Sequence, residues 1–510
     1  MSTARARAEL VAPWLAVAAL VAWSAWHRWQ VLTASPHPVG IDGYFYAIQV
    51  RALLERGALA YPAAPLTFYL MAALAQVTDV VTAVKLVAAI GGALAIVPAF
   101  AIGRRLCGVA GGLVASVVIA TSGGSFYLSL EFVKNGVGVT MALTAVWLGL
   151  RALATPTRGA IALAAGAAIA AVATHKMAAA LVVALLAPAI VVELRARWGP
   201  ARARRAAALA GGALVLAAIA LGALAPARFV AGRDLAELRD ALGGDPRWSL
   251  PAMYVPHPGG RDYALMLGDQ TRIALALAVA AIALAVAARF TARVAAAARP
   301  ADRAAAWSAV AIVLVTAIPV LAIANPDGIG FRLRVAVFAP AALVAAIVVG
   351  RATAALAPTL RLAVIAPMLL VRLWVVDAAP REGVVYAHPA MVAAMVAVPG
   401  RLPPDAVVIT SERHLGFMVA WYARVPVRMR PDPVPPARRW RLLAGNLIGL
   451  GSPLDQALRA AHDRPGLVAP VGTHPYNPSG LVFVPEATWE WVLTQVPPKL
   501  AAYWRRWPTR

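Results

Sequence analysis

One aspartate near the start of the chain is well placed to act as a general base. Asp42 stands in the segment Gly40-Ile-Asp-Gly-Tyr-Phe-Tyr46, which follows a long apolar run almost directly. A carboxylate near a hydroxyl nucleophile can accept the proton that the hydroxyl loses as it attacks. Asp is also favoured as a helix N-cap, and this structural role remains an alternative. The residue three positions later is Phe45, so the Glu or Gln of a capping box is absent.

Two short polar segments carry charges that could meet a substrate. Glu131 lies three residues before Lys134, and the alternative to a functional role is an ion pair on one helix. His175 and Lys176 stand together between two apolar runs. They can contact a phosphate, or their side chains can simply extend to the membrane–water interface.

Two arginines in a later connection are candidate ligands of a lipid phosphate. Arg332 and Arg334 follow the turn-forming sequence Asn-Pro-Asp-Gly and border an apolar run. A charge at this boundary is costly unless an anion meets it, and the planar guanidinium group matches phosphate oxygens. The alternative for both residues is snorkelling to lipid head groups.

The composition indicates what must hold these residues in place. Of the 510 residues, 61% are hydrophobic and 14% are charged, and the mean hydropathy is +0.73. Soluble proteins have about 25% charged residues, so this composition excludes a cytosolic enzyme, a disordered chain and a fibrous protein. The net charge of +24 lies mostly in short connections between apolar runs, which favours membrane orientation over nucleic-acid binding.

Eleven apolar runs are predicted to form transmembrane helices, near 9–27, 80–103, 107–122, 136–150, 159–174, 177–192, 206–226, 271–288, 305–324, 335–350 and 361–377. Arginine accumulates in alternate connections. All eight histidines, and all acidic residues except Glu9, Glu193 and Asp302, fall on the other side. The positive-inside rule therefore predicts a cytoplasmic N-terminus in a bacterial plasma membrane and chemistry at the extracytoplasmic face.

The sequence predicts two domains. Residues 1–377 form an all-α polytopic membrane domain with long outer loops at 28–79 and 227–270. Residues 378–510 are richer in Pro and charge. Runs that begin at Asp405, Val425 and Gly480 are typical of strands, and one that begins at His414 is typical of a helix. We expect a small extracytoplasmic α/β domain there.

The first outer loop resembles that of the GT-C glycosyltransferases. In that family, an acidic residue after the first span precedes a surface helix with Arg and Gly, and then an aromatic segment with Pro. The loop looks like that of oligosaccharyltransferase catalytic subunits, and protein O-mannosyltransferases and aminoarabinose transferases share its plan. The resemblance covers about residues 1–200 in layout and 40–70 in motif. The matching segments are Asp42-Gly-Tyr44-Phe-Tyr46, Leu54-Glu-Arg-Gly57 and Tyr61-Pro-Ala-Ala-Pro65.

The resemblance implies an inverting transfer of a sugar from a polyprenyl-phosphate or -pyrophosphate donor to an acceptor. It implies that Asp42 acts as the base or as a metal ligand. Glu131 and His175 are candidate further ligands if Mg²⁺ or Mn²⁺ is bound. The Asp-x-Asp pair of oligosaccharyltransferase subunits is missing, which weighs against a metal and favours monosaccharide-transferring branches. The residues expected to bind the substrate are Tyr44, Glu131, Lys134, His175, Lys176, Arg332 and Arg334.

Two other functions remain open. A transporter or flippase of a lipid-linked or anionic substrate would carry ionisable groups inside its spans, but the predicted spans are nearly free of charge except for Lys85. An O-antigen ligase or polymerase would rely on Arg and His in the late loop 227–270. The chain has no nucleotide-binding motif, which agrees with a lipid-linked donor. The expected partners are therefore membrane lipid and a lipid-linked sugar, and no nucleic acid.

Overall fold

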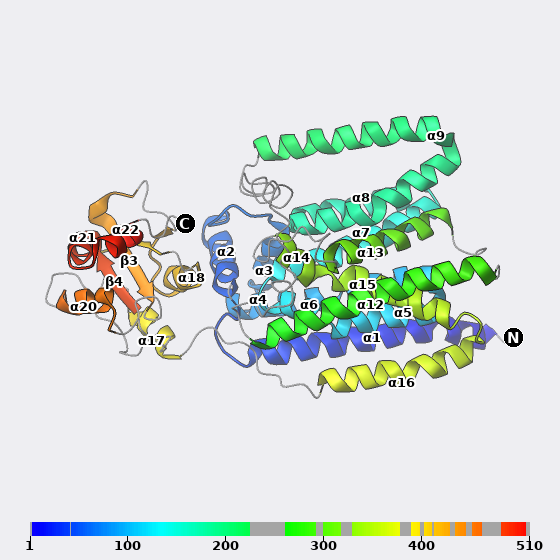
Figure 1. The fold of residues 1–510 in the computed structure, drawn as a ribbon, viewed down its shortest axis with the longest axis horizontal. Helices are drawn as coiled ribbons and strands as arrows, with labels where there is room; N and C mark the ends of the chain where they lie inside the picture. Colours follow the sequence, from blue (N-terminus) through cyan, green and yellow to red (C-terminus); the bar gives the residue numbers. More distant parts are fainter. Residues whose placement is uncertain are drawn as a thin grey trace. The chain divides into compact units, whose positions relative to one another are not determined.

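The computed structural model describes residues 3–40, 42–224, 261–291, 299–317, 329–377, 389–397, 402–410, 413–428, 434–444, 451–461 and 481–505. Most of the predicted outer loop 227–270 lies outside these described residues. The chain divides into two units (Figure 1). Unit 1 comprises Met1–Ala34 and Tyr61–Glu382, and unit 2 comprises Ser35–Ala60 and Gly383–Arg510.

Nearly all residues of unit 1 that the sequence assigns to apolar spans, and that the structure describes, are helical. Among the residues that the structure describes, five stretches are long and apolar enough to cross a membrane, namely Val80–Thr121, Val133–Ala154, Lys176–Arg202, Gln270–Ala287 and Leu333–Ala352. The count of eleven spans stays a prediction. The helices of unit 1 are α1 (Thr3–Thr33), α3 (Leu66–Leu74), α4 (Val80–Ala93), α5 (Ile96–Thr121), α6 (Gly123–Leu130), α7 (Val133–Ala154), α8 (Arg158–Thr174), α9 (Lys176–Leu224), α12 (Arg261–Thr291), α13 (Pro300–Ala317), α14 (Ile329–Ala336), α15 (Phe338–Ala352) and α16 (Pro358–Asp377).

Gly108 reverses the chain between two of the predicted spans. It interrupts α5 with a φ of 73°, a left-handed conformation that glycine adopts without strain. The two arms of α5 then approach closely, because a Cβ added at Gly103 would lie 2.7 Å from the carbonyl oxygen of Gly111. A Cβ added at Gly112 would lie 2.7 Å from Cδ2 of Phe100. The break that the sequence predicts between residues 103 and 107 thus lies at Cys107 and Gly108, as a helical hairpin that packs through glycines.

Contacts between connections show which helix ends of unit 1 lie together. Arg105 forms a 2.6 Å ion pair with Asp302 in the first turn of α13. Arg197 of α9 donates to the carbonyl oxygen of Leu153 near the end of α7. Both contacts join connections that the charge pattern assigns to the same, arginine-rich side of the membrane.

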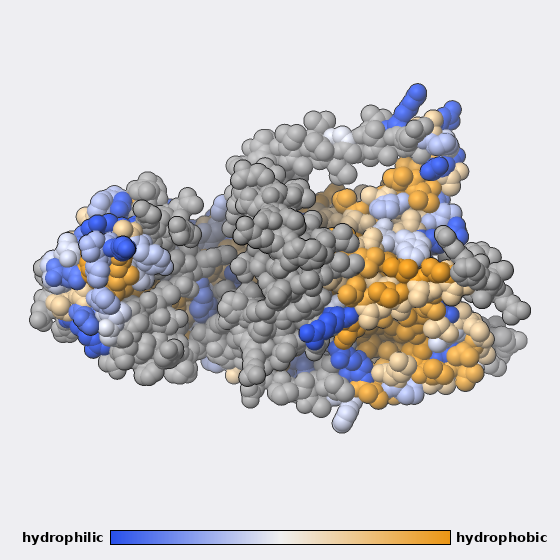
Figure 2. All heavy atoms as spheres, in the orientation of Figure 1, coloured by the Kyte–Doolittle hydropathy of each residue, from blue (hydrophilic) through white to orange (hydrophobic). Residues whose placement is uncertain are grey.

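Large apolar side chains remain exposed on the helices of unit 1. Leu163 and Ile169 of α8 and Trp374 of α16 are 62%, 69% and 70% exposed. Figure 2 shows hydrophobic residues gathered over the visible helices of this unit. Exposure of such an apolar surface to water is unfavourable in free energy, whereas the hydrocarbon of a bilayer solvates it. Together with the five long apolar helices, this surface makes the protein a multi-pass membrane protein.

Unit 2 contains a four-stranded sheet with the strand order β2-β1-β3-β4. β1 (Val407–Ile409) pairs in parallel with β2 (Val427–Arg428) and β3 (Arg439–Ala444), and β3 pairs antiparallel with β4 (Leu481–Pro485). The segments predicted as strands at 405, 425 and 480 form β1, β2 and β4, and the segment at His414 forms a helix. The helices of unit 2 are α2 (Gly43–Arg56), α17 (Pro389–Ala397), α18 (Arg413–Tyr422), η2 (Pro436–Arg438), α20 (Pro453–Ala460), α21 (Glu486–Thr494) and α22 (Pro498–Arg505).

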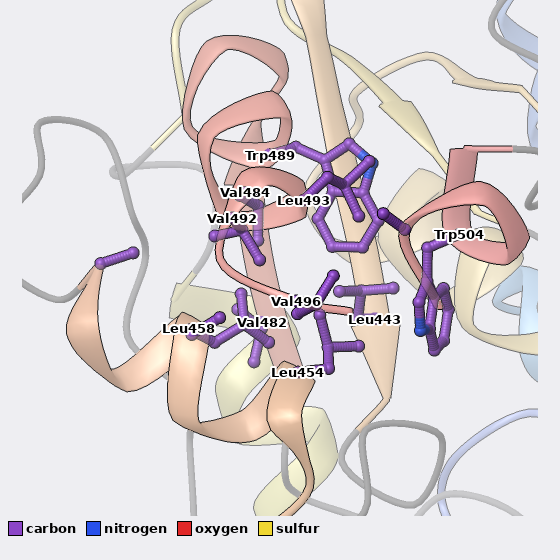
Figure 3. Close-up of a cluster of buried hydrophobic side chains, with 13 residues drawn as sticks. Leu443, Leu454, Leu458, Val482, Val484, Trp489, Val492, Leu493, Val496 and Trp504 are labelled. Atoms are coloured by element: carbon purple, nitrogen blue, oxygen red, sulfur yellow. The ribbon is translucent and has the colours of Figure 1, made fainter. Parts of the chain in front are cut away.

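Helices α20, α21 and α22 share an apolar core with β3 and β4 (Figure 3). Trp489 of α21 has no exposed surface, and its ring meets that of Trp504 of α22 edge-on at a centroid distance of 6.0 Å. Leu443 and Val482 from paired positions of the two strands are buried in the same cluster. Burial of large aromatic side chains dominates the stability of a small core of this kind.

Candidate functional site

Asp42 lies at the first turn of α2, within unit 2. It occupies the N-cap position, yet its side chain makes no capping hydrogen bond. Its carbonyl oxygen accepts from the backbone N–H of Tyr46 at 3.1 Å, so the backbone alone starts the helix. The residue is half-buried. These contacts exclude the purely structural interpretation of Asp42 as a side-chain cap, and they leave its carboxylate at the positive end of the helix dipole.

The segment before α2 is packed tightly against the helix. A Cβ added at Gly43 would lie 3.1 Å from the carbonyl carbon of Pro38. The N–H of Gly43 donates to the carbonyl oxygen of Gly40 at 3.2 Å. A side chain at position 43 would therefore press against Pro38, and the turn that carries Asp42 is compact.

Tyr44 packs inside unit 2 and contacts α18. Its side chain has no exposed surface, and its hydroxyl forms a 3.0 Å hydrogen bond with the hydroxyl of Tyr422 in α18. Burial, and then the Tyr422 hydroxyl, raise the pKa of Tyr44 above its ordinary value. Burial also raises the pKa of Tyr422, although its bond with Tyr44 opposes that shift. Both hydroxyls therefore stay protonated, and the geometry favours positioning over direct substrate contact for Tyr44.

Glu131 and Lys134 lie on opposite sides of a helix break in unit 1. Glu131 follows the end of α6, and Lys134 stands in the first turn of α7. The alternative to a functional role, an ion pair on one helix, is therefore wrong. The side chain of Glu131 is fully buried, while the Lys134 ammonium lies 5.5 Å from the ring centroid of Phe68.

His175 lies beside the first turns of α7. A Cβ added at Gly138 of α7 would lie 3.5 Å from the Cβ of His175. The backbone of His175 is extended, and this residue ends α8. Its Nδ1 accepts a hydrogen bond from the backbone N–H of Met177 at 3.1 Å. The neutral ring then carries its proton on Nε2, which makes Nε2 a donor suited to an anion rather than a metal ligand. Lys176 follows directly and begins α9.

Arg334 belongs to a hydrogen-bonded junction of three helices in unit 1. Gln270 of α12 donates from Nε2 to the carbonyl oxygen of Arg334 at 3.0 Å. The Oε1 of Gln270 accepts from the N–H of Gly124 in α6 at 2.6 Å. Arg334 is half-buried. Arg332 lies in the same helix, α14, but its side chain is outside the described part of the structure.

Arg28 forms a buried polar cluster that the sequence did not indicate. Its side chain is 1% exposed and lies among serines of α1 and α6. Nε donates to Ser129 Oγ at 3.1 Å, Nη2 to Ser125 Oγ at 2.8 Å, and Nη1 to the hydroxyl and carbonyl oxygens of Ser24. The only local signal is the i,i+4 spacing of Ser24 and Arg28 and of Ser125 and Ser129. This cluster ties α1 to α6, the helix that leads to Glu131.

Replacement of Arg28 by Met is expected to destabilise unit 1 by about 1–3 kcal/mol, because the buried serine hydroxyls lose their strongest donor. The measurement is thermal unfolding of the full-length protein in detergent, together with hydrogen exchange of the α6 amides. Exposed Arg151 on α7 provides the control, and its replacement by Met should leave both readouts unchanged. Unchanged protection of α6 in the Arg28 variant would contradict the assigned role.

The predicted metal ligands are divided between the two units, with Glu131 and His175 in unit 1 and Asp42 in unit 2. Among the residues that the structure describes, no three His, Cys, Asp or Glu side chains are close enough together to hold a metal ion. The Nδ1 of His175 is already engaged by Met177. A divalent metal therefore stays a prediction, and the chemistry proposed below uses the carboxylate and the cations.

Comparisons with known proteins place the fold. The chain is similar to the crystal structure of the Archaeoglobus fulgidus oligosaccharyltransferase in complex with Zn and sulfate, at 13% identity and a TM-score of 0.55, over 91% of this chain and 73% of that one. The apo form of the same enzyme matches at 11% identity and a TM-score of 0.55, over 87% of this chain and 71% of that one. ArnT from Cupriavidus metallidurans bound to undecaprenyl phosphate matches at 14% identity and a TM-score of 0.42, over 92% and 97%. No family model and no curated protein sequence matches the chain. The protein thus has a GT-C-like fold.

Proposed function

We propose that this protein is a glycosyltransferase that moves a sugar from a polyprenyl-phosphate or -pyrophosphate carrier to an acceptor at the extracytoplasmic face of a bacterial plasma membrane. The observation that carries the proposal is the position of Asp42 and of its carboxylate. It follows the first long helix of a membrane protein, and its carboxylate is not used to cap α2. The GT-C-like fold supports the proposal, because two of the solved structures that the chain resembles are of an oligosaccharyltransferase.

In the proposed reaction, Asp42 acts as the general base. Its carboxylate takes the proton of the acceptor's nucleophile while the nucleophile's electron pair forms a bond to the anomeric carbon. The bond between that carbon and the phosphate oxygen breaks, and its electron pair leaves with the polyprenyl phosphate. Attack from the side opposite the leaving group inverts the configuration of the sugar.

Cationic groups stabilise the phosphate as it gains negative charge. Lys176 and Arg334 supply fixed positive charge, and the Nε2–H of His175 supplies a neutral donor. Arg332 and Lys134 are further proposed contacts of the donor phosphate, while Glu131 is proposed to bind the sugar. Because the leaving group remains attached to its lipid, these groups must act at the membrane surface.

The direct test is donor turnover by the purified full-length protein in liposomes. Polyprenyl-phosphate- and -pyrophosphate-linked sugars are supplied with three acceptor classes, namely a peptide, a glycolipid and a glycan. We expect release of the polyprenyl carrier together with an inverted anomeric product, as measured by mass spectrometry and NMR. Movement of the intact donor across the bilayer without release of the carrier would instead identify a transporter and overturn the proposal.

A further inference from the structure

Tyr422 joins the two ends of the segment that contains Asp42. Its hydroxyl forms a hydrogen bond with Nδ1 of His37 at 3.1 Å and another with the hydroxyl of Tyr44 at 3.0 Å. His37 precedes Asp42 by five residues, and Tyr44 follows it by two. A single hydroxyl from a residue 378 positions after Tyr44 therefore closes the short loop that carries the proposed base.

Further contacts hold α2 along its length against α18 and the short segment that follows it. Arg51 donates to the carbonyl oxygens of Ala420 and Trp421 at 2.7 and 2.8 Å, and its guanidinium lies 4.7 Å from the centroid of the Trp421 ring. These are carbonyls of the last turn of α18, where a cation is favoured by the helix dipole. Glu55 forms an exposed ion pair with Arg424 at 3.6 Å.

The three contact residues of α2 lie on one face of the helix. Tyr44, Arg51 and Glu55 are spaced by seven and four residues, which places them on one stripe. The Arg51 and Glu55 contacts fix where α2 lies, but both are remote from Asp42. The Tyr422 hydroxyl acts at the first turn of the helix and on the preceding segment, so it alone among these contacts restrains both sides of Asp42.

We propose that Tyr422 is a positioning residue for Asp42, and that α18 of the C-terminal segment is therefore part of the catalytic unit. This inference rests on the proposed function of Asp42. A base must lie within hydrogen-bond reach of its proton, and an error of about 1 Å can cost 100-fold in rate. The hydroxyl of Tyr422 restricts the loop to one arrangement before substrate binds. The carboxylate of Asp42 then need not be moved into place during the chemical step.

The test is the Tyr422→Phe variant of the full-length protein, which keeps the ring and its packing but removes the hydroxyl. We expect kcat for sugar transfer to fall about 10- to 100-fold, with the KM for the lipid donor changed by less than about twofold. We also expect the amide of Gly43, which donates to Gly40, to exchange about 10-fold faster. Tyr503→Phe on α22 is the matched control, because Tyr503 is an exposed tyrosine of the same unit.

A second variant separates positioning from loss of folding. Tyr44→Phe removes the other hydroxyl of the same pair, so the effects of Tyr44→Phe and Tyr422→Phe on kcat should be less than additive. Additive effects, or a Tyr422→Phe variant with unchanged kcat, would overturn the proposal. If the wild-type protein transfers no sugar, the proposed function fails. The Gly43 amide then still decides whether Tyr422 orders the segment, and unchanged exchange there would overturn the structural role as well.

Discussion

Replacement of Asp42 by Asn is expected to lower kcat for sugar transfer by about 100- to 10,000-fold, the usual contribution of a general base. Asn has nearly the same shape but cannot accept the nucleophile's proton. Because the backbone of Asp42, not its side chain, starts α2, the variant should fold normally. The measurement is the transfer assay with a lipid-linked donor, accompanied by thermal unfolding to verify the fold.

Asp79 provides a matched control for the Asp42 variant. It is also an N-cap aspartate, but its Oδ1 accepts from the N–H groups of Val81 and Thr82 at 2.9 and 3.0 Å. A hydrogen bond with the side chain of Thr82, followed by the backbone hydrogen bonds, holds the pKa of Asp79 below its ordinary value, and burial opposes that shift. Asn caps helices about as well as Asp, so Asp79→Asn should leave transfer unchanged. Full activity of Asp42→Asn would exclude Asp42 as the base and favour a ligase or polymerase that uses the loop 227–270.

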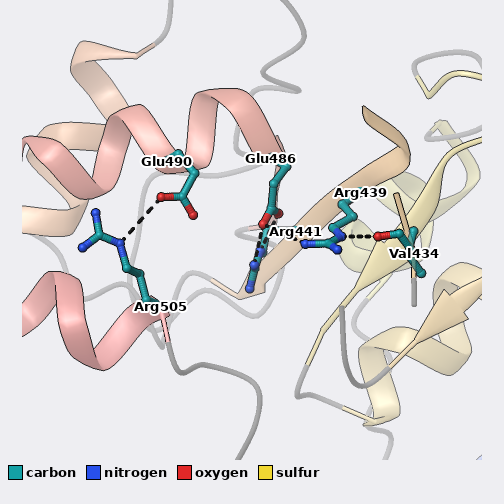
Figure 4. Close-up of polar contacts among 6 residues, drawn as sticks. All are labelled: Val434, Arg439, Arg441, Glu486, Glu490 and Arg505. Atoms are coloured by element: carbon teal, nitrogen blue, oxygen red, sulfur yellow. Dashed lines mark hydrogen bonds and ion pairs between the residues drawn. The ribbon is translucent and has the colours of Figure 1, made fainter. Parts of the chain in front are cut away.

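Replacement of Arg441 by Met is expected to destabilise unit 2 by about 3–5 kcal/mol. Arg441 of β3 binds both carboxylate oxygens of Glu486 at 2.9 and 2.8 Å (Figure 4). The two side chains are only 5% and 10% exposed, so the variant would leave a buried carboxylate with Arg439 at 3.7 Å as its remaining ionic partner. The measurement is hydrogen exchange of the paired β3 and β4 amides in the full-length protein.

A second ion pair in Figure 4 serves as the control for Arg441. Arg505 and Glu490 lie 3.6 Å apart with side chains that are about half exposed, and Arg505→Met should cost less than about 1 kcal/mol. The double variant Arg441→Met with Glu486→Gln should recover much of the lost stability, because no buried charge is then left without a partner. A loss below about 1 kcal/mol for Arg441→Met would show that water solvates Glu486.

The arrangement of unit 2 was only partly visible in the sequence. Alternating apolar residues and turn signals predicted β1, β2, β4 and α18 near their observed positions. β3 was not predicted, and nothing in the sequence showed that residues 35–60 pack with the C-terminal segment. The motif around Asp42 therefore directed attention to the proposed base, but Tyr422 was not identified, because a hydrogen bond across 378 positions leaves no local pattern.

The sequence by itself determined the membrane character, the approximate positions of the apolar helices that the structure describes, and the segment that carries Asp42. These features depend on hydropathy, length and neighbouring residues, which are local properties of the chain. Only the tertiary structure decided that Asp42 is not a side-chain cap, that Tyr44 is buried against Tyr422, and that Arg28 lies among three serines. The free energy of those contacts depends on which distant groups exclude water from one another, and that is fixed only when the helices pack.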